Sequence, residues 1–273
     1  MGNMSESRRK TVVTGSEPFF WLAALSGSVI VAFILFPLFE MVAQPSLASL
    51  WETAADKDVR FSIFLSVATA GAAALIALLL GTPLAYLLAR HQFRGKRLLE
   101  SVIDLPIMIP HPVVGIAILG IAGRNHWLGH AMQQVGIQIM GTVTGLVTVL
   151  TFVGLPFYIN TAKAGFEAIP ERLENVSRSL GASTAATFFR VTLPLGWRSM
   201  VVGMIMCTAR AVSEFGAVVI VAYHPMVAPV MIYERFTAYG LKYSQPVAVW
   251  LILVCLFLFL LLRIFSNPTK KAV

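Results

Sequence analysis

Charged side chains are scarce in this chain of 273 residues. Only 12% of the residues are Asp, Glu, Lys or Arg, whereas 57% are hydrophobic, and the mean hydropathy is +0.78. A water-soluble globule of this length needs more polar surface than such a composition supplies. The composition therefore excludes a soluble protein and predicts an integral membrane protein.

Groups that carry out chemistry are also few. The two cysteines, Cys207 and Cys255, both lie inside apolar runs, which favours small buried residues over a disulfide or a metal site. The only Gly-Lys pair is Gly95-Lys96, and Arg90 stands where a phosphate-binding loop needs its first glycine. No apolar run carries a His/Asp/Glu metal set or a Ser/His pair at useful spacing. We expect no catalytic residue, no metal and no cofactor, and therefore no membrane-embedded enzyme.

Six apolar segments provide the roughly 20 residues that a helix needs to cross a hydrocarbon core of about 30 Å. They are residues 20–42, 61–89, 98–123, 142–164, 201–223 and 247–265. The predicted fold class is an all-α integral membrane protein with six transmembrane helices. We assign residues 1–18 to an N-terminal tail, 19–43 to the first transmembrane helix, 60–265 to the main transmembrane domain and 266–273 to a C-terminal tail.

The basic residues orient these spans. If the N-terminus is cytoplasmic and the spans alternate, about fifteen Lys and Arg residues fall inside and about five outside. This asymmetry predicts that both termini are cytoplasmic. The net charge of +8 is then mainly a topology signal, and nucleic acid is not an expected partner because the cations lie at helix ends and not in one patch.

The stretch from 163 to 198 is too polar to remain in lipid, yet it has helical periodicity. Apolar residues recur at spacings of four, three and four, at Ile169, Leu173, Val176 and Leu180. This pattern predicts an amphipathic helix with Pro170 in its first turn, acidic residues near its N-terminus, and Gly181 as a left-handed C-terminal cap. Periodicity alone also allows a connector that lies on the inner leaflet.

A second short helix is expected after the glycine. Ser183 is a suitable N-cap for a helix that runs to about Arg190, and Pro194 is expected to reset the chain into the fifth span. The two helices make the 165–196 segment a helix-turn-helix loop.

Ionisable residues and prolines mark the membrane interior. Arg210 and Glu214 lie four residues apart on one helix face and can pair, since each charge alone is costly in lipid. The pair either holds helices together or places Arg210 along an anion route or gate. In the third span, prolines at 106 and 110 predict a kinked or broken helix near the path. His111 beside them is either a hydrogen-bonded packing residue or a ligand contact.

The loop resembles a known motif. Gly181 is followed after nine residues by Val191-Thr192-Leu193-Pro194, which is similar to the second half of the cytoplasmic loop motif of ABC-importer permeases. The opening Glu-Ala-Ala of that motif is not matched, because Asn175-Val176-Ser177 stands there and Glu174 lies one residue early. Either Glu171 or Glu174 is therefore left to meet a basic residue of the ATPase.

Further runs extend the resemblance over about residues 60–265. Ser213-Glu214-Phe215-Gly216-Ala217 is shared with sulfate permeases, whereas the runs 223–229 and 232–235 are more similar to permease subunits of molybdate/tungstate ABC importers. That resemblance implies a homodimer in a prokaryotic inner membrane, two ATPase subunits that bind the ATP, and an extracytoplasmic oxyanion-binding protein.

Three sets of residues are expected to carry these roles. The ATPase-coupling set is Glu171, Glu174, Leu180, Gly181, Ala182, Ser183, Phe188, Val191, Leu193 and Pro194. The translocation-path or gate set is Asp104, Pro110, His111, Arg210 and Glu214. The binding-protein docking set is Met226, Tyr233, Glu234 and Arg235. The alternatives are a sulfate permease of the same kind and a stand-alone secondary carrier that uses Arg210 and Glu214 as an ion site.

Overall fold

The computed structural model describes residues 18–123 and 126–266, and every regular element in these ranges is a helix. Most of the predicted tails, 1–18 and 266–273, lies outside them. Five of the described helices are long and apolar enough to cross a membrane, or six if one bent pair counts as a single span. The predicted all-helical, membrane-spanning fold class is confirmed.

The chain forms two compact units, which divide after Ser46. The first contains α1 (Pro18–Ala43), which covers the residues predicted for the first span. It is apolar on every face, with a mean hydropathy of 2.4, as expected of a helix surrounded by lipid.

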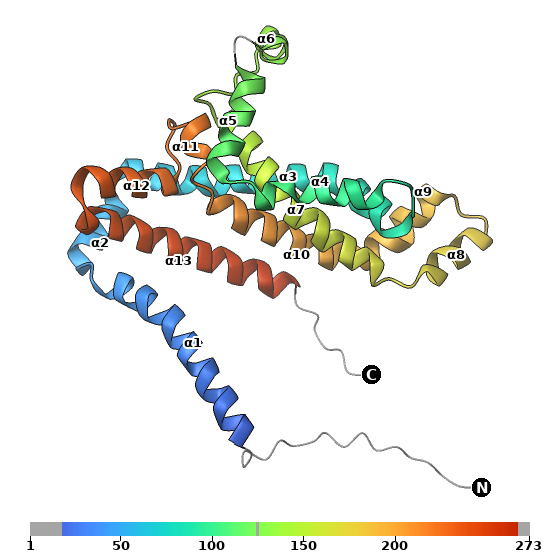
Figure 1. Cartoon of the computed structure of the whole chain (residues 1–273), viewed down its shortest axis with the longest axis horizontal. Helices are drawn as coiled ribbons and strands as arrows, with labels where there is room; N and C mark the ends of the chain where they lie inside the picture. The colour runs from blue at the N-terminus through green and yellow to red at the C-terminus, as the bar shows by residue number, and fades with distance from the viewer. Residues whose placement is uncertain (1–17, 124–125, 267–273) are drawn as a thin grey trace. The chain divides into compact units, whose positions relative to one another are not determined.

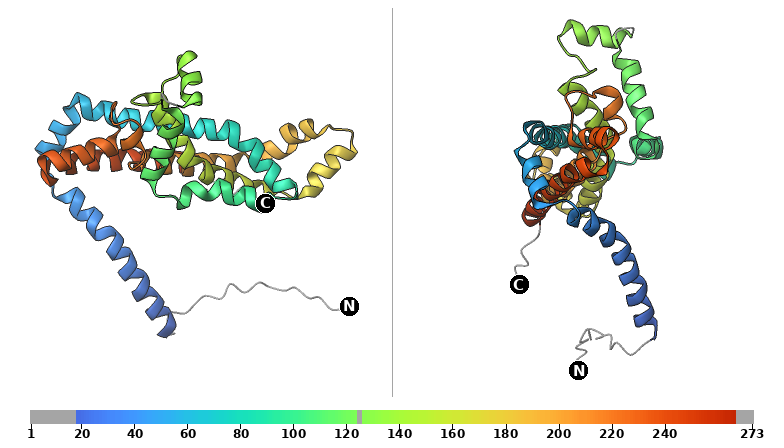
Figure 2. Two further views of the ribbon diagram at one scale, coloured as in Figure 1. Left: turned by 45° about the horizontal axis from the view of Figure 1, so that its top comes forward. Right: turned by 90° about the vertical axis from the view of Figure 1, so that its left-hand side faces the viewer.

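The second unit is a bundle built on α3 (Lys57–Arg90), α7 (Val143–Glu167), α10 (Leu193–Val212) and α13 (Leu241–Ser266), which run side by side (Figures 1 and 2). At one end of this bundle lie α2 (Leu47–Ala55) and α12 (Ala228–Tyr239). At the opposite end lie α8 (Glu171–Ser179) and α9 (Thr184–Thr187). We call these the α12 end and the loop end.

Small residues let the central helices approach closely. Ala70, Ala73 and Ala77 of α3 are fully buried. In α7, a Cβ added to Gly154 would lie 2.5 Å from the sulfur of Cys207 on α10, so only glycine fits this crossing. Because lipid gives helices no hydrophobic reason to associate, such contacts are a main source of helix packing in membranes.

The predicted third span is broken, as its prolines indicate. It consists of α4 (Lys96–Met108) and α5 (His111–Ala122), bent by 110° at the break. Pro110 has no N–H to continue the ladder of α4 and becomes the N-cap of α5. The short helix α6 (Trp127–Gln134) follows.

The predicted bounds of the fifth span, 201–223, are wrong. Helix α10 begins earlier and ends at Val212, and the apolar residues after it fold back as the short helix α11 (Val218–Val221). Val218 and Val221 are buried in the protein core. Their hydrophobicity therefore reflects packing against protein and not contact with lipid.

Candidate functional site

Helix α8 ends in the predicted left-handed cap. Gly181 has φ +90°, its N–H donates to the carbonyl of Arg178, and the next N–H donates to the carbonyl of Ser177. These two bonds define a Schellman motif. A Cβ at Gly181 would meet nothing within 4 Å. The glycine is therefore favoured by its left-handed backbone conformation and not by a lack of space for a side chain.

The apolar stripe of α8 faces away from its own chain. Leu173, Val176 and Leu180 are 39%, 57% and 84% exposed, whereas Glu174 is 1% exposed. Ile169 was predicted to share the stripe, but it precedes the helix and is buried in the core. The helix therefore turns a carboxylate inward and an apolar face outward.

Glu174 is held by side chains of two other elements. Its Oε1 accepts hydrogen bonds from Arg90 Nε at 2.8 Å and Thr192 Oγ1 at 2.8 Å, and its Oε2 accepts one from Tyr86 at 3.1 Å. Arg90 also donates to the carbonyl of Ile169 at 3.0 Å. We call Arg90, Glu174, Tyr86 and Thr192 the α8 clamp, because they fix the loop to the end of α3.

The clamp favours the ionised form of its carboxylate. Burial alone would raise the pKa of Glu174, but the hydrogen bonds from Arg90 and Thr192 outweigh burial and hold the pKa below the ordinary glutamate value. Of the two acidic candidates for contact with an ATPase, Glu174 is therefore already bonded to side chains of its own chain. Glu171 is exposed at the first turn of α8.

The segment after Gly181 is continuous with α10. Ser183 caps α9 as predicted, since its Oγ accepts from the N–H of Ala186 at 3.2 Å. The prediction that Pro194 resets the chain is wrong: α9 passes through a π-helical turn, η1 (Phe188–Thr192), directly into α10. The wider turn lets the Leu193 N–H reach the carbonyl of Phe188, and the helix thereby accommodates the proline that follows.

The predicted coupling residues fall into two groups. Phe188 and Leu193 pack against the core beside the clamp, and the Phe188 ring meets that of Tyr86 edge-on at 4.8 Å. Glu174 is buried in the clamp itself. The remaining members of the set lie wholly or partly at the surface of the loop; they are Glu171, Leu180, Gly181, Ala182, Ser183, Val191 and Pro194.

Three of the predicted path residues come together at the α4–α5 break. Arg210 Nη2 lies 2.6 Å from Glu214 Oε2, which confirms the predicted pair, and 2.9 Å from the ring nitrogens of His111. His111 Nδ1 also lies 3.4 Å from Glu214 Oε2, so the imidazole contacts both members of the pair. Glu214 is 1% exposed and its Oε1 accepts from the N–H of Ala217 at 2.9 Å. The exposed flank of the cluster is formed by His111 and part of Arg210.

A glycine allows this approach. A Cβ added to Gly216 would lie 3.0 Å from His111 Cβ, so a side chain there would push the start of α5 away. Asp104 does not join the cluster, since it accepts a hydrogen bond from Asn160 of α7 at 2.7 Å. Pro110 lies exposed at the break itself.

At the α12 end, the predicted docking residues differ in exposure and in their contacts with their own chain. Arg235 pairs with Asp56 at 2.5 Å, and Met226 packs partly buried against the core. Tyr233 is exposed, and its ring centroid lies 4.9 Å from that of Phe215 with the rings tilted by 47°; Glu234 is partly exposed. Burial would raise the pKa of Asp56, but its hydrogen bond with Arg235 and those from backbone N–H groups hold it below the ordinary value.

Several of these partners cannot be identified from local sequence patterns. Arg90 is one of the basic residues that indicate topology and stands where a phosphate-binding loop needs a glycine, and neither observation points to Glu174. Tyr86 and Asp56 belong to no motif. Ser66 of α3 accepts the Ala228 N–H at 2.7 Å and so caps α12 from another helix. These contacts join residues 84 to 179 positions apart, which no local pattern reports.

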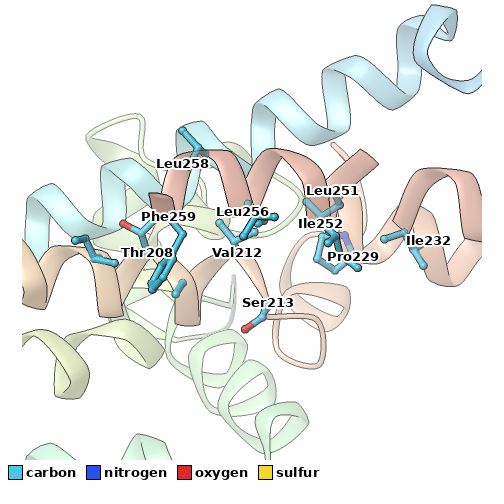
Figure 3. A pocket seen from close by; sticks show the side chains of 13 residues that line it. Thr208, Val212, Ser213, Pro229, Ile232, Leu251, Ile252, Leu256, Leu258 and Phe259 are labelled. Atoms are coloured by element: carbon cyan, nitrogen blue, oxygen red, sulfur yellow. The ribbon is translucent and has the colours of Figure 1, made fainter. Parts of the chain in front are cut away.

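A large hollow in the bundle is unsuited to an anion. A cavity of about 660 Å³ lies between α10, α12 and α13 (Figure 3), lined mainly by aliphatic and aromatic side chains. Thr208 and Ser213 are its only hydroxyl-bearing lining residues, and the Ser213 hydroxyl already donates to the carbonyl of Arg210. In residues 18–123 and 126–266, no group of three or more His, Cys, Asp or Glu side chains is placed to hold a metal ion.

Comparison with known proteins identifies the family to which the chain is related. Residues 81–270 match the family described as "Binding-protein-dependent transport system inner membrane component". A molybdate/tungstate transport system permease protein of Pyrococcus abyssi is 41% identical over 94% of this chain and 99% of its own length. A probable sulfate transport system permease protein of Chlorokybus atmophyticus is 31% identical over 89% of this chain and 87% of its own.

A solved structure agrees with the fold. A chain of a bacterial alginate ABC transporter, in complex with a periplasmic protein that carries an alginate pentasaccharide, superposes with a TM-score of 0.75 at 13% identity, covering 93% of this chain and 96% of that one. At this identity the likeness bears on the fold alone. This chain belongs to the family of inner-membrane permease components of binding-protein-dependent ABC transport systems.

Proposed function

We propose that this permease forms the membrane path of an ATP-driven importer whose cargo is a tetrahedral oxyanion, molybdate or tungstate. The cargo assignment is supported by a relative of that name with 41% identity over nearly the whole chain, against 31% for a sulfate relative. The observation that carries the mechanism is the outward apolar face of α8.

This face has the properties of a docking surface for another protein. Leu173, Val176 and Leu180 are exposed, and the α8 clamp fixes the helix from behind. The chain has no phosphate-binding loop, so ATP hydrolysis belongs to a separate ATPase subunit that buries this face. Two copies of the chain with two ATPase subunits form the working assembly. The excess of Lys and Arg on one side of the expected spans supports a cytoplasmic location for the loop end and both termini.

The ATPase supplies the free energy for the conformational change, which the cargo cannot provide. Moving a two-state bundle from 1:99 to 99:1 takes about 5.5 kcal/mol of differential binding, and a substrate that must be released in every cycle cannot provide it. Closure of the ATPase dimer displaces α8, and the displacement opens the path toward the α12 end.

The His111, Arg210 and Glu214 cluster suits brief passage of an anion. Arg210 and a ring N–H of His111 offer donors on the exposed flank. Glu214 neutralises Arg210 from the buried side, so the cluster attracts an oxyanion without the net positive charge that would trap it. Selectivity then rests mainly with an extracytoplasmic binding protein, which docks near Tyr233 and Glu234 at the α12 end.

Uptake by the complete complex tests the proposal. Proteoliposomes that contain the permease, its ATPase and its binding protein are loaded with ATP, and uptake of labelled tungstate is measured with unlabelled molybdate or sulfate as competitor. We expect molybdate to compete and sulfate to compete poorly. Displacement by sulfate alone would overturn the cargo assignment in favour of the sulfate alternative. Undiminished uptake without the ATPase would overturn the coupling in favour of a secondary carrier.

A further inference from the structure

A second, polar cavity lies at the loop end of the bundle. Its volume is about 430 Å³, and it is formed by the segment after α3, the start of α4 and one residue of α7. Three of its lining residues are cations and one is a carboxylate; these four are Lys96, Arg97, Lys163 and Glu100. Nothing in the proposed transport cycle uses this cavity.

The charges of the cavity do not cancel. Lys163 Nζ lies 2.5 Å from Glu100 Oε1 and 3.7 Å from Glu167 on its own helix, so its charge is neutralised. Lys96 and Arg97 form no ion pair with any residue that the structure describes. Three cations face the one carboxylate of the lining, and that carboxylate also attracts Lys96 and Arg97, so the lining keeps a net positive charge. It borders a hollow that is large enough for a headgroup.

An apolar stripe begins next to these cations. Leu98, Val102 and Leu105 follow at helical spacing on α4 and are 70%, 51% and 45% exposed. Together α4 and α5, bent by 110° at the break, are long and apolar enough to form a broken membrane span, and the exposed stripe is apolar as contact with lipid tails requires. Phe93, which lines the cavity, is also exposed.

We propose that Lys96 and Arg97 bind the phosphate of an anionic phospholipid, whose acyl chains lie along the Leu98–Leu105 stripe. The cations match the negative headgroup, and the neighbouring stripe matches its tails. A basic pocket at the end of membrane helices is a favourable site for such headgroups, and each cation near the surface contributes about 1 kcal/mol. Free phosphate would share the charge but would gain nothing from the stripe.

The experiment measures retention of phosphatidylglycerol by the full-length permease. The protein is placed in bilayers of phosphatidylcholine and phosphatidylglycerol in equal parts, and the relative binding of the two lipids is measured by native mass spectrometry. The variant Lys96→Gln/Arg97→Gln should lower the preference for phosphatidylglycerol about thirty-fold. The control Lys57→Gln/Lys242→Gln removes the same charge from exposed residues outside the cavity and should leave the preference unchanged.

A variant of opposite sign separates binding from damage to the fold. Glu100→Gln removes the one carboxylate of the cavity lining, which attracts Lys96 and Arg97 as well as Lys163. It should strengthen the preference, which misfolding cannot do. An equal loss in the control variant would overturn the proposal, because the attraction would then be diffuse. Release of bound phosphatidylglycerol by millimolar inorganic phosphate would also overturn it, because the site would then recognise a free anion.

Discussion

Replacing Glu174 with alanine removes the carboxylate on which the α8 clamp depends. Arg90, Tyr86 and Thr192 all donate to it. After the substitution the Arg90 guanidinium remains buried, with the carbonyl of Ile169 as its remaining hydrogen-bond partner among the described residues. The α8 helix should then separate from α3 without any change to its outward apolar face.

The expected cost follows from this burial. The Arg90 and Glu174 side chains are 6% and 2% exposed, and breaking a buried ion pair by removing one partner costs about 3–5 kcal/mol. The better helix propensity of alanine returns at most about 0.7 kcal/mol. Glu171→Ala, on the exposed side of the same helix, should change stability by no more than about 0.5 kcal/mol.

Hydrogen exchange of the purified permease measures the effect locally, because amide opening reports the free energy of each segment. Amides of α8 should exchange at least about a hundredfold faster in Glu174→Ala than in the native chain, while those in the middle of α7 stay unchanged. Arg90→Ala should give a similar result, and the double variant should cost about 1.5–3 kcal/mol less than the sum of the two. Strict additivity, or equal exchange in the Glu174 and Glu171 variants, would refute the clamp.

Four further outcomes are expected. Because the pKa of Glu174 is lowered, the clamp should contribute its full stability above about pH 4.3 and lose it as the pH falls through the folded pKa. Hydrogen-exchange protection of α8, measured across a pH series, would reveal this loss. Gly181→Ala should destabilise the α8 turn by about 1 kcal/mol and lower uptake per ATP hydrolysed. Gly216→Ala should reduce uptake by displacing His111, whereas Gly120→Ala, whose Cβ meets nothing within 4 Å, should not. Asp56→Ala removes the N-cap of α3 and an ion pair and should lower thermal stability by about 1–2 kcal/mol.

Features governed by neighbouring residues were predictable from the sequence. The left-handed cap at Gly181, the Ser183 cap and the break at Pro110 each follow from the conformational preferences of one or two residues. The Arg210–Glu214 pair follows from helical spacing alone. The identity of the loop as an amphipathic helix followed from its periodicity, which is a sum over many weak signals.

Features that depend on distant contacts were not predictable. Periodicity identifies the apolar face of α8 but not the side that its own chain covers, and here the covered side carries Glu174. The partner of that carboxylate, Arg90, is 84 positions away. Likewise, the predicted fifth span extends past the true end of α10 because Val218 and Val221 are as apolar as lipid-facing residues. The turn at Gly216 directs these two residues into the core.

Two continuous helices connect the clamp to the rest of the path. Thr192 bonds Glu174 immediately before α10 (20 residues) begins, and α10 carries Arg210 near its other end, which corresponds to a rise of about 27 Å from Thr192. Helix α3 holds Arg90 at its last residue and contacts the N-terminus of α12 through Ser66. In the proposed coupling, we therefore expect a displacement of α8 to be passed by one helix to the His111–Arg210–Glu214 cluster and by the other to the α12 end. Because the clamp joins both helices to the loop, its loss should uncouple the two responses together.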